Sequence, residues 1–137
     1  MIEFVTEDIS HISINEDNIT DWIEKIINQE NKLLGDVCFI FCSDIYLLKI
    51  NQEYLQHDYY TDVITFDYSN NNIISGDIFI SIDRINDNAN TYNISFNNEL
   101  LRVIIHGILH LIGYNDKTDK EKKIMTSKEN ESLKQYK

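Results

Sequence analysis

Two histidines four residues apart could hold a metal ion. His106 and His110 lie in an apolar stretch of helical length that runs from Leu100 to Asp116. In a helix this spacing places both imidazoles on one face, about 6 Å apart. Gly113 can adopt the positive φ that ends a helix, which would turn Asp116 toward the two histidines. The pattern therefore predicts a three-ligand N,N,O site with one position open to water, as in catalytic zinc sites.

The residue after the first histidine limits the chemistry of this site. The pattern H-x-x-x-H-x-x-G-x-x-[HD] has the spacing of an elongated metalloprotease site, in which Glu follows the first His as general base. Gly107 occupies that position here. The sequence therefore argues against a peptidase and indicates Lewis-acid chemistry on another substrate. The histidine pair alone also fits two core side chains with satisfied hydrogen bonds, and that alternative remains open.

Alternating helix and strand patterns surround the motif. Strands are expected at residues 2–5, 37–42, 62–68 and 74–82. Helices are expected at residues 18–34, 43–54 and 83–94, then through the motif, and finally at 118–133. These elements indicate a mixed sheet of about four strands packed with helices, of α+β or α/β class, with the metal motif on a central helix.

Cap residues set the expected ends of three helices. The helix at 18–34 is expected to begin at Asn18 and to stop at Gly35, with Leu33 and Leu34 on its apolar face. Ser95 is the expected cap of the motif helix. Before the final helix, T-x-x-E at residues 118–121 is a capping box.

Composition indicates one domain, residues 1–137. The 137 residues are 42% hydrophobic, enough to bury roughly two thirds of the unfolded surface around one core. No apolar run is long enough to span a membrane, and the acidic N-terminus lacks the basic region of a signal peptide.

The two cysteines are expected to be reduced. Cys38 and Cys42 are expected to be core residues about 13 Å apart along a strand, too far for a disulfide. We therefore expect a cytoplasmic protein.

The charge of the chain changes sign after the motif. Residues 1–116 carry 19 acidic and 5 basic side chains, whereas residues 117–137 carry 7 lysines and 4 acidic side chains. The acidic part argues against tight non-specific binding of nucleic acid, which requires a broad basic surface. The basic part fits either a solvated helix face or a surface that meets phosphate.

Several motifs in order resemble the YbeY family of rRNA maturation factors. They are L-x-x-x-N-x-x-Y followed by TDVITF at 61–66, GDIFIS at 76–81 and HGILHLIGY at 106–114, and the resemblance covers roughly residues 44–130. It implies a mixed α+β fold. It also implies a metal-dependent, single-strand-specific endoribonuclease that acts in rRNA maturation and ribosome quality control.

The resemblance implies roles for individual residues. The first two metal-binding histidines of the family fall on His106 and His110, and the third falls on Asp116, where most members have His. Asp is an ordinary zinc ligand, so the site is expected to survive, although its negative charge should leave a bound water less acidic. The family also has an arginine after N-x-x-Y, thought to act on the RNA, and this chain has Leu55 there.

Loss of that arginine matters because phosphodiester hydrolysis requires positive charge where the transition state gathers negative charge. Arg102, one turn before His106, and Lys117, directly after Asp116, could supply it. Arg102 fits a salt bridge with a carboxylate equally well, and Lys117 a solvated first turn of the last helix.

Other candidates have simpler explanations beside the functional one. His57 could approach the site, but a loop histidine without a second ligand is most often exposed, and the same holds more strongly for His11. Tyr59 and Tyr60 could stack on unpaired bases or cover the edge of the core. At the start of its strand, Asp62 is expected to bond the backbone.

The sequence therefore predicts a zinc-dependent hydrolase with one ion per chain, another divalent metal being an alternative. The ion is expected to polarise a phosphate of single-stranded RNA, with water or the 2′-hydroxyl as nucleophile. Expected partners are rRNA and the ribosome or a ribosomal protein, with no membrane and no DNA. Two alternatives remain: a ribosome-assembly factor that acts by binding and has a structural metal site, and a metal hydrolase of small molecules or peptides.

Overall fold

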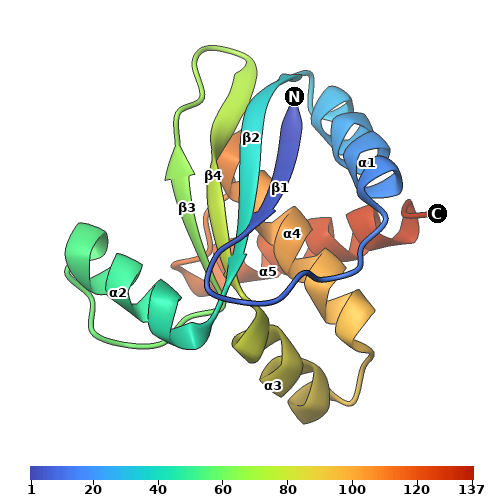
Figure 1. Ribbon diagram of the computed structural model, residues 1–137. Helices are drawn as coiled ribbons and strands as arrows, with labels where there is room; N and C mark the ends of the chain where they lie inside the picture. The colour runs from blue at the N-terminus through green and yellow to red at the C-terminus, as the bar shows by residue number, and fades with distance from the viewer.

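A four-stranded mixed sheet covered by helices forms the protein (Figure 1). The computed structural model describes all residues, 1–137. The elements in chain order are β1 (Ile2–Thr6), α1 (Glu16–Gln29), β2 (Leu33–Cys42), α2 (Asp44–Leu55), β3 (Val63–Asp67), β4 (Ile73–Ser81), α3 (Ile82–Tyr92), α4 (Phe96–Ile112) and α5 (Asp119–Lys134). The predicted α+β class is thereby confirmed.

The sheet has the strand order β1-β2-β4-β3. β1, β2 and β4 are parallel, and β3 pairs antiparallel with β4 at the edge. Alternate side chains of β2 and β4 point to one face, so Phe39 and Ile78, which are register partners, are both fully buried there. Helices α1 and α4 pack on that face, and α5 packs on α4. Together with the sheet these helices enclose a core of 21 buried residues.

The first helix differs from its predicted bounds. α1 begins after Asn15, whose side chain accepts a hydrogen bond from Asn18 N, and it ends at Gln29. Leu33 and Leu34 were expected on this helix, which is wrong, because they pair with β4 as the first residues of β2. Asn31 takes a left-handed conformation with φ 61° and separates the helix from the strand.

Other predicted boundaries are confirmed. Ser95 caps α4 by accepting a hydrogen bond from Asn98 N at 3.0 Å. Thr118 and Glu121 form the capping box that begins α5. Each cap satisfies backbone N–H groups that a helix start otherwise leaves without partners.

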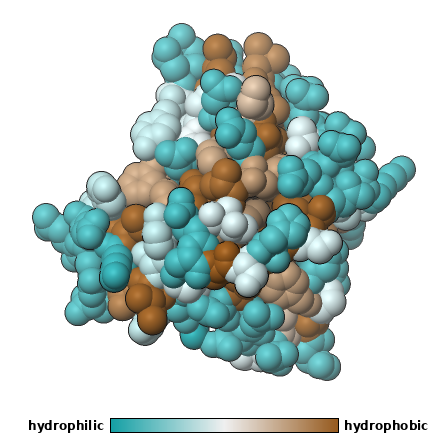
Figure 2. Space-filling view, in the orientation of Figure 1, coloured by the Kyte–Doolittle hydropathy of each residue, from teal (hydrophilic) through white to brown (hydrophobic).

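The face drawn in Figure 2 is largely hydrophilic. In the orientation of Figure 1, hydrophobic side chains show in the middle of the molecule, with smaller groups at its upper and lower edges (Figure 2). None of the helices combines the length and the apolar character that a membrane crossing requires.

Helix α4 lies very close to β4 at Gly107. A Cβ atom added there would lie 2.9 Å from Ile78 Cγ2 and 3.1 Å from its Cδ1. Real Cβ contacts are longer, so any side chain at position 107 must displace either Ile78 or the helix. The absence of a side chain at this position therefore sets the distance between α4 and the sheet.

Replacing Gly107 by alanine is expected to destabilise the protein by about 1–2 kcal/mol. Overpacking costs about 1–3 kcal/mol, and the better helix propensity of alanine returns about 0.5–1 kcal/mol. Urea unfolding measures the change, and the double variant with Ile78→Ala tests its cause. Ile78→Ala removes both atoms that the new Cβ would contact. In the Ile78→Ala background, Gly107→Ala should therefore cause no loss of stability. An unchanged penalty in the Ile78→Ala background would show that this contact is not responsible.

Candidate metal centre

Helix α4 presents His106 and His110 side by side. Their ring centroids are 4.5 Å apart with the planes nearly perpendicular, and the two Nε2 atoms are 3.0 Å apart. Both side chains are mostly buried, with 17% and 24% of their surface exposed. The two imidazoles therefore converge at one point rather than spreading into the core.

The turn after α4 brings in a carboxylate. Gly113 ends the helix with φ 125°, and its N–H bonds back to the carbonyls of Leu109 and His110. This positive φ is unfavourable for residues with a Cβ, and it redirects the chain as the spacing predicted. Asp116 Oδ2 then lies 3.3 Å from Nε2 of His106 and 3.4 Å from Nε2 of His110.

These three residues fit a divalent metal. One ligand atom from each lies within 4.8 Å of the others, and they form the only such group of His, Cys, Asp or Glu in the protein. Two imidazole nitrogens and one carboxylate oxygen are a common donor set for zinc, and three protein ligands leave a position for another molecule. The side chain of Asp116 is 39% exposed, so this position is open to solvent.

A buried carboxylate on α5 orients the first histidine. Glu129 is 4% exposed, and its Oε2 lies 2.6 Å from Nδ1 of His106. An ionised carboxylate can only accept a hydrogen bond, so Nδ1 must be the donor in this contact. The neutral imidazole of His106 therefore carries its proton on Nδ1. Nε2 is then left with its lone pair directed at His110 and Asp116. Such carboxylate partners fix the tautomer of metal-binding histidines and raise their basicity.

The guanidinium of Arg102 pairs with Glu129 and balances its negative charge. Its guanidinium bonds Glu99 through two nitrogens, at 2.8 and 2.7 Å, and Glu129 through a third at 3.2 Å. Glu99 is completely buried, and its hydrogen bonds raise the pKa of Arg102, which keeps the guanidinium charged. The sequence left two roles open for Arg102, a cation for the RNA phosphate and a salt bridge with a carboxylate, and the structure shows the salt bridge. In the structure the guanidinium is held by two buried carboxylates and supports His106 instead.

The two histidines have different pKa values. Burial lowers the pKa of His106, but the hydrogen bond and charge of Glu129, together with the charges of Asp116 and Asp62, outweigh it, so the net pKa is raised. Burial and the neighbouring His106 lower the pKa of His110. Without metal, a proton on the pair therefore resides on His106.

Metal affinity is expected to rise with pH, because a metal must displace this proton. Since the pKa of His106 is raised above 6.5, roughly one proton should be released on binding below that pH and none at alkaline pH. Calorimetric titration in buffers of different ionisation enthalpy measures this number. Without metal, His106 adds stability at acidic pH that is lost as pH rises through its raised pKa. A metal affinity that is constant between about pH 5 and 8 would contradict the assignment.

Two further positions named from the sequence are both exposed. They are Lys117, the second candidate cation, and Leu55, which stands where the family has an arginine. Lys117 donates its backbone N–H to Glu121, and its side chain forms no ion pair. Leu55 ends α2 with 40% of its surface exposed. Neither belongs to the metal-ligand group.

The loop between α2 and β3 carries the remaining candidates. His57 and Tyr59 stack with ring centroids 5.1 Å apart, and the Tyr59 hydroxyl meets His57 Nδ1 at 3.0 Å. Tyr60 lies against the guanidinium of Arg84 at 5.8 Å. His57 and His11 are both exposed and lie outside the group of three ligands.

Sequence reasoning missed two acidic residues around the centre, Glu129 and Glu99, and assigned a third, Asp62, only to backbone bonding. Glu129 gave one signal, since it shares a helical face with Met125 and Ser132, the other buried residues of α5. For Glu99 the only signal in the sequence was its position three residues before Arg102. Burial raises the pKa of Asp62, and the charges of His106 and Arg102 oppose this increase.

The sequence profile of the family described as Endoribonuclease YbeY matches residues 4–137. The chain belongs to this family. Membership in the YbeY family confirms the resemblance and places the chain among endoribonucleases, which are hydrolases of RNA.

Curated YbeY relatives match over most of their length. The Endoribonuclease YbeY of Christiangramia forsetii is 53% identical over 118 residues, which cover 86% of this chain and 82% of the relative. That of Parabacteroides distasonis is 49% identical over 132 residues, covering 96% and 93%. A solution structure from Thermotoga maritima has a TM-score of 0.70 and 30% identity, covering 98% of this chain and 87% of that one.

Proposed function

We propose that this YbeY family member is a zinc-dependent endoribonuclease that cleaves single-stranded rRNA during ribosome maturation in the cytoplasm. His106, His110 and Asp116 would hold one ion per chain, zinc first and another divalent metal second. The observation that carries the proposal is the convergence of three ligand atoms within 4.8 Å in a member of an endoribonuclease family. The choice of zinc follows from the two nitrogen donors.

A divalent ion, when bound, supplies Lewis-acid polarisation of a phosphate oxygen and acidifies water. The residues of the chain provide the setting for that chemistry. Glu129 holds the proton on Nδ1 of His106 and so keeps Nε2 available as a ligand. Gly113 turns the chain so that Asp116 closes the site on its exposed side. Arg102, bound to carboxylates, keeps Glu129 in place and is not available to phosphate.

The acidic body favours a basic protein as a second partner. Residues 1–116 carry 19 acidic and 5 basic side chains, which suits a ribosomal protein better than bare RNA. Binding on the ribosome would then bring the centre to its RNA. This surface also supports the alternative of an assembly factor that acts by binding.

The test is metal content together with cleavage. Elemental analysis of the purified protein should find close to one zinc per chain, and the protein should cleave a single-stranded rRNA fragment but not the same fragment in a duplex. A chelator should abolish cleavage, and added zinc should restore it. Zinc bound without cleavage of any RNA would reject the nuclease and favour the assembly factor with a structural metal.

A further inference from the structure

Four lysines follow directly on the metal centre. Residues 117–123 read KTDKEKK, and the lysine cluster consists of Lys117, Lys120, Lys122 and Lys123. All four are exposed. The Cα of Lys120 lies at most about 14 Å from that of Asp116, because it follows four positions later in the chain. The cluster therefore begins next to a ligand of the centre, and Lys120 lies within about 14 Å of it.

Stability does not explain the cluster. Lys128 is the only lysine of the chain that forms ion pairs, with Glu30 and Glu131, although acidic residues outnumber basic ones almost twofold. The cluster also lies at the start of α5, where the helix dipole disfavours cations. Four unpaired positive charges thus accumulate where neither ion pairing nor the helix favours them.

The centre has no other free cation beside it. Arg102 is held by Glu99 and Glu129, and Lys128 pairs with Glu30 and Glu131. A phosphodiester strand approaching a site with this many carboxylates needs compensating positive charge.

We propose that the lysine cluster binds the phosphate backbone of single-stranded RNA next to the scissile position. This inference rests on the proposed function. Exposed ammonium groups on flexible stems bind phosphates as point charges without reading sequence, so the cluster should contribute affinity and not base preference. Each contact should add about 0.7 to the slope of log affinity against log salt.

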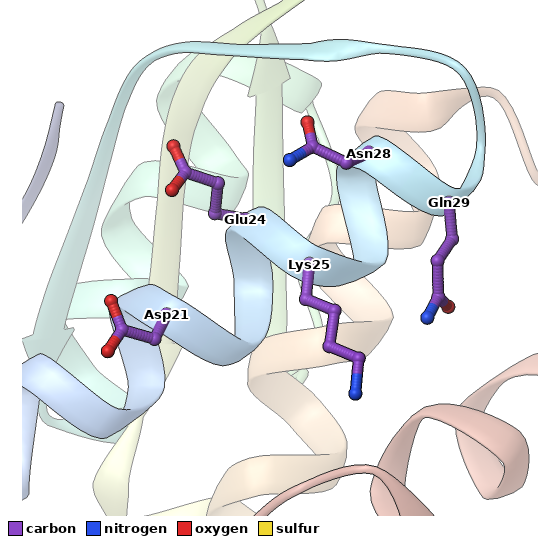
Figure 3. A pocket seen from close by; sticks show the side chains of 5 residues that line it. All are labelled: Asp21, Glu24, Lys25, Asn28 and Gln29. Carbon is purple, nitrogen blue, oxygen red and sulfur yellow. The ribbon is translucent and has the colours of Figure 1, made fainter.

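Four of the five other lysines without an ion pair offer a matched control. Lys25 lies on the outer face of α1 and lines a shallow pocket with other polar side chains (Figure 3). A neighbouring pocket is lined by both Lys25 and Lys137, which follows the C-terminal end of α5. Lys134 is about 21 Å along α5 from Lys120. Lys32, between α1 and β2, completes a set with the same charge as the cluster.

The test compares two fourfold lysine-to-glutamine variants, one of the cluster and one of the control set. Glutamine has a similar helix propensity to lysine, so both should fold. Binding of a labelled single-stranded oligoribonucleotide is measured in the His110→Ala background, which is expected not to cleave. The cluster variant should bind at least about tenfold more weakly at about 0.1 M salt. The slope of its log affinity against log salt should be smaller in magnitude by about 2 to 3. The control variant should lose much less.

Kinetics of the metal-loaded proteins separate this inference from the proposed function. If the wild type cleaves RNA, the cluster variant should show a raised KM with little change in kcat. Equal affinity, salt slope and KM in the wild type and the cluster variant would overturn the inference and leave the nuclease intact, as would equal losses in cluster and control variants. Binding that depends on the cluster in a protein that never cleaves RNA would support the surface and reject the nuclease.

Discussion

Replacing His110 by alanine is expected to remove bound metal and ribonuclease activity together. His110 Nε2 is one of three ligand atoms that converge, and the two that remain lie 3.3 Å apart and hold a metal poorly. Loss of a residue that only supports a ligand costs about 10- to 100-fold in metal affinity or activity, so loss of a ligand should cost at least about 100-fold. Elemental analysis and cleavage of single-stranded RNA measure the two effects.

His11→Ala is the matched control, because His11 is exposed and outside the ligand group. It should keep both metal and activity. Asp116→His offers a second comparison, since it preserves the number of ligands and should retain metal. Full activity in the His110→Ala protein would show that the reaction does not depend on this centre.

Replacing Glu129 by glutamine is expected to weaken metal binding about 10- to 100-fold without touching a ligand. Glutamine keeps the size of the side chain but removes the charge that faces His106 Nδ1 and Arg102. The pKa of His106 should fall, because its raised value depends on Glu129. Metal titration and NMR titration of His106 in metal-free protein measure the two changes.

Glu131→Gln serves as the control on the same helix. Glu131 is exposed and pairs only with Lys128 at 3.7 Å, so its removal should change stability by less than about 1 kcal/mol and leave metal binding unchanged. Glu129→Ala should also destabilise the fold by about 1–3 kcal/mol, because Arg102 keeps Glu99 as its partner but both Arg102 and His106 lose a buried hydrogen-bond acceptor. An unaltered His106 pKa in the Glu129→Gln variant would contradict the positioning role.

Local patterns were sufficient to predict most of the fold. Helix periodicity, caps and apolar strand runs predicted the order of the elements, and the spacing of His106, His110 and Asp116 predicted their convergence. The error at Leu33 and Leu34 has a physical reason: both residues continue the apolar helix pattern, but pairing with β4 outweighs it.

The partners of the site residues could not be predicted in the same way. Glu129 reaches His106 across 23 positions of sequence, and only the packing of α5 on α4 brings them together. Arg102 has a partner within one turn, Glu99, yet its second partner depends on that same packing. A sequence identifies groups capable of chemistry more readily than it identifies which of them are already engaged.

The contact between Gly107 and Ile78 restricts the evolution of this protein. Metalloproteases with similar histidine spacing carry their general base at the position of Gly107. Here that position faces the fully buried Ile78, with no room for a glutamate. A glutamate at position 107 would therefore also require a smaller residue at position 78 or a shift of the helix. The close packing of helix on strand thus separates this protein from such peptidases by available space as well as by chemistry.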